Sequence, residues 1–227
     1  MNNDQLNVIF EDNHLLVCLK PPGVLSQPGD KNLPDMLTIG KEYLKAKYSK
    51  PGNVFLGLVH RLDLNVGGIM AFAKTSKGAS RLSKSIRDKL FHKKYYAVVE
   101  ASLTVGSEVA LEDYLSKDED ERISFSSNEF DGKQALLHYK VLDSIQINQK
   151  NYSLVDIILY TGRFHQIRKQ FSLINAPLVG DKKYGSTTES KTIALFAYGL
   201  SFPHPITQEL MSFEQKPNFG IFSKFNL

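Results

Sequence analysis

The chain has 227 residues, 42% of them hydrophobic and 23% charged, which is the composition of a globular protein with one large or two small domains. Its formal charge of +4 is compatible with an anionic partner but does not require one. The single cysteine, Cys18, excludes an internal disulfide and a zinc cluster built on cysteines. The sequence has no signal peptide and no apolar run of about 18 residues, so we expect a cytoplasmic protein without membrane association.

The first half of the chain alternates short apolar runs with two helical patterns. A turn separates the first two runs, and Pro21-Pro22-Gly23 ends the second one because proline cannot continue a ladder. Thr75-Ser76 is typical of a helix N-cap. The expected elements are strands over 8–11 and 15–20, a helix over 33–48, strands over 54–59 and 69–73, and a helix through about Lys89.

The second half shows mostly strands with alternating polarity. We expect strands over 91–99, 123–127, 135–142, 152–160, 193–200 and 210–213, and one further helix after Gly162. The acidic run over 118–121 is predicted to be a solvated loop, and the weakest candidate domain boundary lies within 103–133. Many short strands with about three helices predict a single α+β domain over 1–227, with a mixed, mainly antiparallel sheet and a central cleft.

A polar segment lies between two of the expected strands. Its residues 60–63 read His-Arg-Leu-Asp, and Gly67-Gly68 follows. An acid held at the end of a buried strand loses hydration, so it needs a partner or a function. The ordinary alternative is that Asp63 only closes a turn beside the glycines.

The helix after Gly162 carries an arginine on its apolar side. Phe164, Ile167 and Phe171 form a stripe at helical spacing, and Arg168 falls inside it. An arginine that points inward must meet an anion, because an unpaired buried guanidinium is very costly. We predict that this anion is Asp63; the alternative is that the long side chain reaches solvent at the edge of the stripe.

Five motifs along the chain together carry a family resemblance. They are, in chain order, His60-Arg61-Leu62-Asp63, Lys94-Tyr95, the run from Thr161 to Arg168, Gly180-Asp181 with Tyr184-Gly185, and the run from Leu200 to Pro205. These motifs resemble those of the RluA-type pseudouridine synthases, which isomerise uridine in RNA. The resemblance covers about residues 8–213 and departs from the family pattern at Val66-Gly67, where the family has two hydroxyl residues before the last glycine. It implies a catalytic domain without the small RNA-binding module that precedes it in many relatives.

The resemblance implies a reaction and roles for four residues. A specific uridine of ribosomal or transfer RNA is isomerised, with Asp63 acting either as nucleophile or as base on the flipped-out nucleotide. Tyr95 would be the platform under the base, Arg61 would fill the space that the base leaves, and Arg168 would pair with the acid. The rearrangement stays within one nucleoside, so we expect no cofactor and no metal. We also expect a monomer.

Contact with the RNA backbone is predicted for a set of basic residues. These are Lys93, Lys94, Arg163, Lys169, Lys182 and Lys183. Tyr95 and Tyr96 must point to opposite faces of their strand, and we expect Tyr95 to face the cleft and Tyr96 the core. Two other classes remain open. A non-catalytic RNA-binding protein would not require an inward Asp–Arg pair, and a hydrolase would normally show a second acid or metal ligands.

Overall fold

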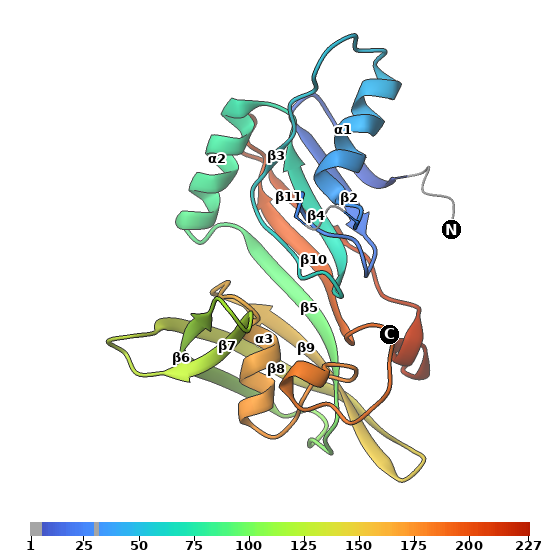
Figure 1. Cartoon of the computed structure of the whole chain (residues 1–227), viewed down its shortest axis with the longest axis vertical. Helices are drawn as coiled ribbons and strands as arrows, with labels where there is room; N and C mark the ends of the chain where they lie inside the picture. Colours follow the sequence, from blue (N-terminus) through green and yellow to red (C-terminus); the bar gives the residue numbers. More distant parts are fainter. Residues whose placement is uncertain (1–5, 30–31) are drawn as a thin grey trace. The chain divides into compact units, whose positions relative to one another are not determined.

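The computed structural model describes residues 6–29 and 32–227, and the chain forms two compact units. The first unit comprises Met1–His92 and Gly199–Gln215, and the second comprises Lys93–Tyr198 and Lys216–Leu227. Strands β5 (His92–Val99) and β10 (Leu195–Pro203) run through the points where the chain passes from one unit to the other (Figure 1). The expected single domain over 1–227 stays a prediction.

The first unit is built mainly on antiparallel pairs: β1 with β2, β2 with β4, β3 with β4, and β10 with β11. The strand order is β1-β2-β4-β10. All seven residues of β4 are buried, as expected for a central strand with an apolar run. The elements of this unit are β1 (Asn7–Glu11), β2 (Leu15–Lys20), α1 (Met36–Lys47), β3 (Gly57–Leu58), β4 (Gly67–Ala73), α2 (Ser76–Arg87) and β11 (Leu210–Glu214).

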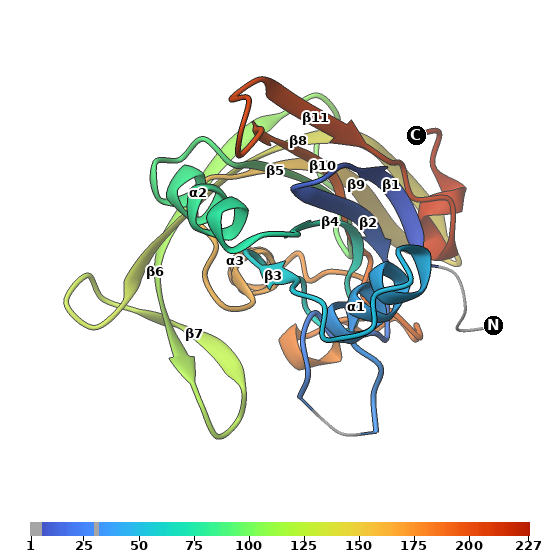
Figure 2. The ribbon, with the colours of Figure 1, turned by 90° about the horizontal axis from the view of Figure 1, so that it is seen from above.

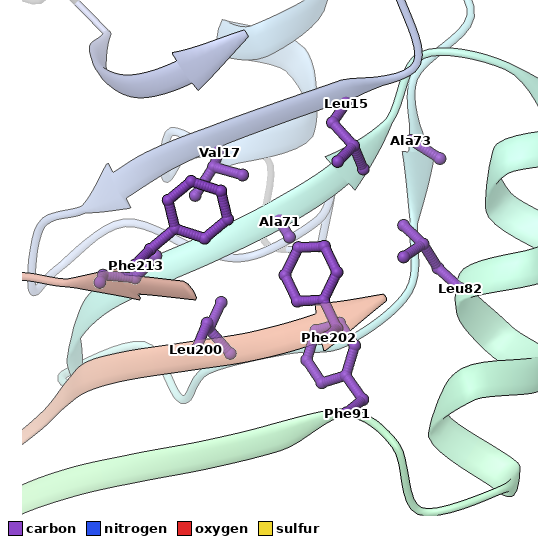
Figure 3. Packing of buried hydrophobic residues seen from close by; sticks show 10 residues of the cluster. Leu15, Val17, Ala71, Ala73, Leu82, Phe91, Leu200, Phe202 and Phe213 are labelled. Atoms are coloured by element: carbon purple, nitrogen blue, oxygen red, sulfur yellow. The ribbon is translucent and has the colours of Figure 1, made fainter. Parts of the chain in front are cut away.

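Alternate residues of three neighbouring strands form the core of the first unit. They lie on the face of the strands that carries α2, and Leu82 of that helix packs among them (Figure 3). The rings of Phe91 and Phe202 stack there with their centroids 4.8 Å apart. The other core residues are Leu15, Val17, Ile69, Ala71, Ala73, Leu200 and Phe213.

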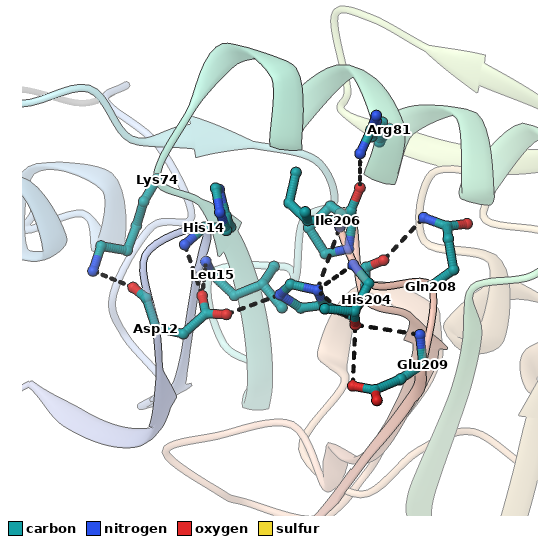
Figure 4. Close-up of polar contacts among 11 residues, drawn as sticks. Asp12, His14, Leu15, Lys74, Arg81, His204, Ile206, Gln208 and Glu209 are labelled. Atoms are coloured by element: carbon teal, nitrogen blue, oxygen red, sulfur yellow. Dashed lines mark hydrogen bonds and ion pairs between the residues drawn. The ribbon is translucent and has the colours of Figure 1, made fainter.

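A polar network joins the turn between β1 and β2 to the turn between β10 and β11. Asp12 accepts hydrogen bonds from the backbone N–H groups of His14 and Leu15, at 2.7 and 2.6 Å. His204, which is 5% exposed, accepts the Thr207 N–H at Nδ1, so its Nε2 carries a hydrogen and donates it to Asp12 at 2.8 Å (Figure 4). The Pro-His-Pro motif thus has a structural role in this unit.

The second unit is an antiparallel sheet with a helix on one face. Its strand order is β5-β9-β8-β6-β7, and all the pairs along this path are antiparallel. Figure 2 shows β6 and β7 as a hairpin that extends away from β8 and β9. Tyr139 of β8 packs on Phe171 of α3, with ring centroids 5.0 Å apart, so α3 covers the Tyr139 face. The elements are β6 (Glu108–Asp118), β7 (Ile123–Ser127), β8 (Lys133–Ile147), β9 (Lys150–Leu159), α3 (Gln166–Leu173) and 3₁₀ helices over Lys182–Tyr184 and Gly220–Lys224.

The α+β class and the mainly antiparallel sheet are confirmed, and two details differ from the prediction. The strand expected over 54–59 is only the two-residue β3, and β6 was not expected. None of the helices in the described part of the chain is both long and apolar enough to span a membrane. The central cleft stays a prediction.

Candidate active site

Asp63 lies in the segment between β3 and β4, in the first unit. Its side chain is half-buried between two buried neighbours, Leu62 and Val66. The Val66 N–H donates to the Asp63 carbonyl at 3.1 Å and closes a turn there. Earlier in the segment, His60 accepts the Ala71 N–H at Nε2, at 3.0 Å. The expected turn at Asp63 is therefore correct for the backbone.

The loop after β2 holds the backbone on both sides of Asp63. The hydroxyl of Ser26 donates to the Leu62 carbonyl at 2.7 Å and accepts the Leu62 N–H at 3.0 Å. The Leu64 carbonyl accepts from the Gly23 N–H at 2.8 Å and from the Lys20 ammonium at 3.0 Å. The position of Asp63 is thus fixed by contacts to its two neighbours.

Lys20 is a site residue that the sequence did not reveal. Its residue exposure is 0%, and its ammonium also donates to the carbonyls of Pro21 and Val24, at 3.0 and 2.6 Å. Burial lowers the pKa of Lys20 to about 7, and the negative charge of Asp63 opposes that change. A lysine at the end of an apolar strand usually reaches solvent, so its burial was not expected. The only signal in the sequence is the turn Pro21-Pro22-Gly23, which directs the chain back over Lys20.

Arg168 does point inward, as predicted, and it meets an anion within its own unit. It is 6% exposed, and its Nε and Nη2 contact the two carboxylate oxygens of Asp181 at 2.6 and 2.8 Å. Asp181 is 1% exposed, so this is a buried bidentate ion pair. The burial of Arg168 therefore does not by itself require Asp63, which was the premise of the predicted pair. Asp63 lies in the other unit, and its pairing with Arg168 stays a prediction.

The turn before α3 is held by side-chain contacts that sequence reasoning missed. Gln166, 3% exposed, accepts at Oε1 from the Thr161 hydroxyl (2.8 Å) and from the Arg163 N–H (3.0 Å). His165 has φ +49°, a left-handed conformation that is uncommon for residues other than glycine. Its ring lies 3.0 Å from the Tyr184 hydroxyl, measured at Nδ1. These contacts fix the direction in which α3 begins.

Tyr95 and Tyr96 point to opposite faces, but their burial is the reverse of the prediction. Tyr95 pairs with Ile157, which pairs with Tyr139, so Tyr95 shares the face that α3 covers. It is 5% exposed, whereas Tyr96 is half-buried and stacks on Tyr198 at 3.8 Å between centroids. Truncation of Tyr95 is therefore expected to cost stability.

The predicted RNA-contacting residues differ in burial and in the partners they have, and their contact with RNA stays a prediction. Arg61, in the first unit, is exposed, as a residue that enters a vacated base position must be. Lys93 and Lys94 point to opposite faces of β5, so they cannot both share the face of Tyr95. Burial lowers the pKa of Lys93. The remaining residues are Arg163 and Lys169, with Lys182 paired to Glu189 and Lys183 bonded to the carbonyls of Glu121 and Arg122.

Other chemistry has few candidates in the described residues. Among them, no group of three His, Cys, Asp or Glu side chains is placed to hold a metal ion. Cys18 is buried, and burial raises its pKa to about 12, which leaves its thiol protonated and unreactive.

Comparisons with known proteins give the same assignment along most of the chain. The family model described as RNA pseudouridylate synthase matches residues 14–173. Ribosomal large subunit pseudouridine synthase D of Borreliella burgdorferi is 32% identical over 208 residues, which are 88% of this chain and 61% of the relative. The dual-specificity RNA pseudouridine synthase RluA of Haemophilus ducreyi is 31% identical, over 96% of both chains.

Solved structures support the fold. Human RNA pseudouridylate synthase domain containing 1 superposes with a TM-score of 0.77 at 20% identity and covers 97% of this chain. Human RNA pseudouridylate synthase domain containing 4 gives 0.73 at 21% identity, over 96% of this chain. The family match spans Asp63 and Arg168 and confirms the expected family. The chain belongs to the RNA pseudouridylate synthase family.

Proposed function

We propose that this chain isomerises a uridine of ribosomal or transfer RNA to pseudouridine and that Asp63 is the carboxylate that acts on the target nucleotide. Two independent observations support Asp63. The family match includes Asp63, and the loop 20–26 fixes the backbone on either side of it. A catalytic group must be held in position before the substrate arrives, and these contacts provide that.

The chemistry needs one carboxylate and no external reactant. The N1–C1′ bond breaks, the base turns within the site, and a C5–C1′ bond forms. The hydrogen on C5 is then lost and N1 gains a proton, so the atoms balance within the nucleoside. Asp63 could attack C1′ as a nucleophile or remove a proton from the ribose as a base, and both roles use the ionised carboxylate.

Three other residues complete the proposal. Tyr95 supplies an aromatic surface for the target base, and Arg61 occupies the space that the base leaves in the RNA. Arg168 acts from α3, where Asp181 fixes the orientation of its guanidinium. A guanidinium held in a fork by one carboxylate still has N–H groups that can serve a second acceptor.

The ribosome is the better supported source of the substrate. The relative in Borreliella burgdorferi is named for the large ribosomal subunit, and the relative in Haemophilus ducreyi is named a dual-specificity RNA enzyme. We therefore propose ribosomal RNA first and transfer RNA second.

The experiment that tests the reaction is incubation of the purified chain with RNA from cells that lack its gene. Pseudouridine should appear at one or a few positions, and the mass of the RNA should not change. A mass change or released uracil would show a hydrolase, and uridine that stays unmodified with RNA bound would show a binding protein. Either result would overturn the proposal.

A further inference from the structure

A pocket of about 440 Å³ lies in the second unit, between the β6–β7 hairpin and the turn before α3. Its volume is in the range of small-ligand sites and is sufficient for one nucleotide. Three cationic side chains, Lys117, Lys133 and Arg163, line it together with Phe164. The other lining residues are Leu115, Ser116, Glu119, Ser124, Asp131 and Gly162.

Two of these cations have N–H groups without a hydrogen-bond partner in the described residues. Arg163 is anchored by its Nε, which donates to the Gln134 carbonyl at 2.8 Å, and its terminal NH₂ groups have no partner among residues 6–29 and 32–227. The Lys133 ammonium likewise has no hydrogen-bond or ion-pair partner in the part of the chain that the structure describes. Lys117 lies 4.9 Å from the Phe164 ring and pairs with Glu119, whose side chain is 78% exposed. The pocket can therefore receive an anion without breaking a buried ion pair.

A largely exposed aromatic residue is the sequence neighbour of this pocket's lining. Phe130, in the loop between β7 and β8, is 88% exposed and directly precedes Asp131 of the pocket lining. The loop is ordered by Asn128, whose Oδ1 accepts the N–H groups of Phe130 and Asp131, at 2.9 and 3.0 Å, and whose Nδ2 donates to Asp131 at 2.8 Å. Solvent-exposed aromatic rings combined with a cationic groove are the features by which proteins bind single-stranded nucleic acid.

We propose that this surface, formed by Lys117, Lys133, Arg163 and Phe130, binds a single-stranded segment of the RNA substrate. A backbone phosphate lies on Lys133 and Arg163, and a base stacks on Phe130. The RNA as ligand rests on the proposed function; the location of the contact rests on the pocket and on Phe130. Because every base has a flat face, this contact adds affinity with little sequence preference.

The test is the binding of a short, fluorescently labelled single-stranded RNA to the full chain between about 50 and 200 mM salt. Each phosphate contact to a single strand contributes about 0.7 to the slope of log affinity against log salt. Lys133→Gln and Arg163→Gln should each reduce that slope by about 0.7, and Lys191→Gln, a matched exposed lysine of the same unit, should leave it unchanged. Unchanged slopes for both pocket variants would overturn the phosphate contact.

A second variant separates a nucleotide from a bare phosphate. Phe130→Ser should weaken RNA binding roughly tenfold without changing the slope, and inorganic polyphosphate should compete equally well with both proteins. Leu210→Ser, at another exposed apolar residue (72%), is the control and should bind as the wild type does. Wild-type affinity of Phe130→Ser would overturn the stacking contact.

The outcome is separable from that of the proposed function. If the wild type forms pseudouridine but the pocket variants bind RNA normally, only this inference fails. If the variants behave as expected but no pseudouridine forms, the proposed function fails and the binding surface stands.

Discussion

Lys20 shows how a single buried charge can organise the candidate active site. Three carbonyl oxygens surround its ammonium, and the form with three N–H bonds is the protonated one. Burial lowers its pKa to about 7, so near neutral pH the folded chain holds both forms of this group. Protonation of Lys20 therefore changes the hydrogen bonds that hold the Asp63 segment near neutral pH.

Replacement of Lys20 by methionine is expected to destabilise the fold by roughly 2 kcal/mol at pH 7, because buried carbonyls lose their donor. The effect should grow with pH. Between about pH 7 and pH 10 the unfolded chain keeps the proton on Lys20 while the folded chain releases it, so the wild type gains stability as pH rises. Urea unfolding of both proteins should show a difference that widens by about 2 kcal/mol from pH 7 to pH 9. A constant difference would contradict the lowered pKa.

The buried pair of Arg168 and Asp181 makes a second prediction at the scale of residues. Arg168→Ala should cost about 3–5 kcal/mol of unfolding free energy, because it leaves the carboxylate of Asp181 buried without a partner. Lys182 directly follows Asp181 in the sequence and forms an exposed ion pair with Glu189, so Lys182→Ala should cost less than about 1 kcal/mol. Urea unfolding measures both. Equal small losses would mean that the Arg168–Asp181 pair is not formed in solution.

Glu11 connects β1 to α1 and to the segment after β4. Its carboxylate accepts hydrogen bonds from Lys47, Lys74, Tyr43 and Tyr48, at 2.7 to 2.9 Å. Burial alone would raise the pKa of Glu11, but these hydrogen bonds outweigh it and lower the pKa to about 2. A carboxyl with a lowered pKa stabilises the fold above its ordinary value of 4.5, and that contribution is lost as the pH falls toward 2.

Glu11→Gln should therefore lower the unfolding free energy by about 2 kcal/mol at pH 7, and the difference from wild type should shrink below about pH 4.5. Glu42→Gln, at an exposed position of α1, is the control and should stay within about 0.5 kcal/mol of wild type. Thermal or urea unfolding from pH 7 to pH 3 measures this. A difference that persists unchanged at low pH would show that packing, and not charge, is lost in Glu11→Gln.

The elements that the sequence predicted well are those whose pattern comes from one buried face. Strand β2 begins and ends where expected, and α2 agrees to within about two residues at its C-terminal end. Strand β6 was missed because its residues are mostly exposed or half-buried and it carries charges along its length. Its apolar residues therefore show neither the helical repeat nor the alternation of a strand. Its strand character comes from hydrogen bonds to β8 and β7, which are not local in sequence.

For the whole molecule, the sequence identified motifs better than it identified their contacts. It found Asp63 and the inward Arg168, and its family assignment is confirmed by the match over 14–173. It did not find Asp181 as an anion for Arg168, because that contact joins α3 to a loop beyond it and no local pattern marks Asp181 as buried. It also missed Lys20 and Ser26, whose contacts to the Asp63 segment depend on how the loop 20–26 folds back.

The central claim is that the carboxylate of Asp63 carries out the isomerisation. The most direct test is single-turnover conversion of a verified uridine by Asp63→Asn, which keeps the shape of the side chain and removes its charge. The account predicts a folded protein that binds the RNA and forms no pseudouridine, with mass spectrometry confirming that the asparagine has not deamidated to aspartate. Asp88→Asn, at an exposed helix end, should convert uridine as the wild type does. Conversion by folded Asp63→Asn at the wild-type rate would contradict the account.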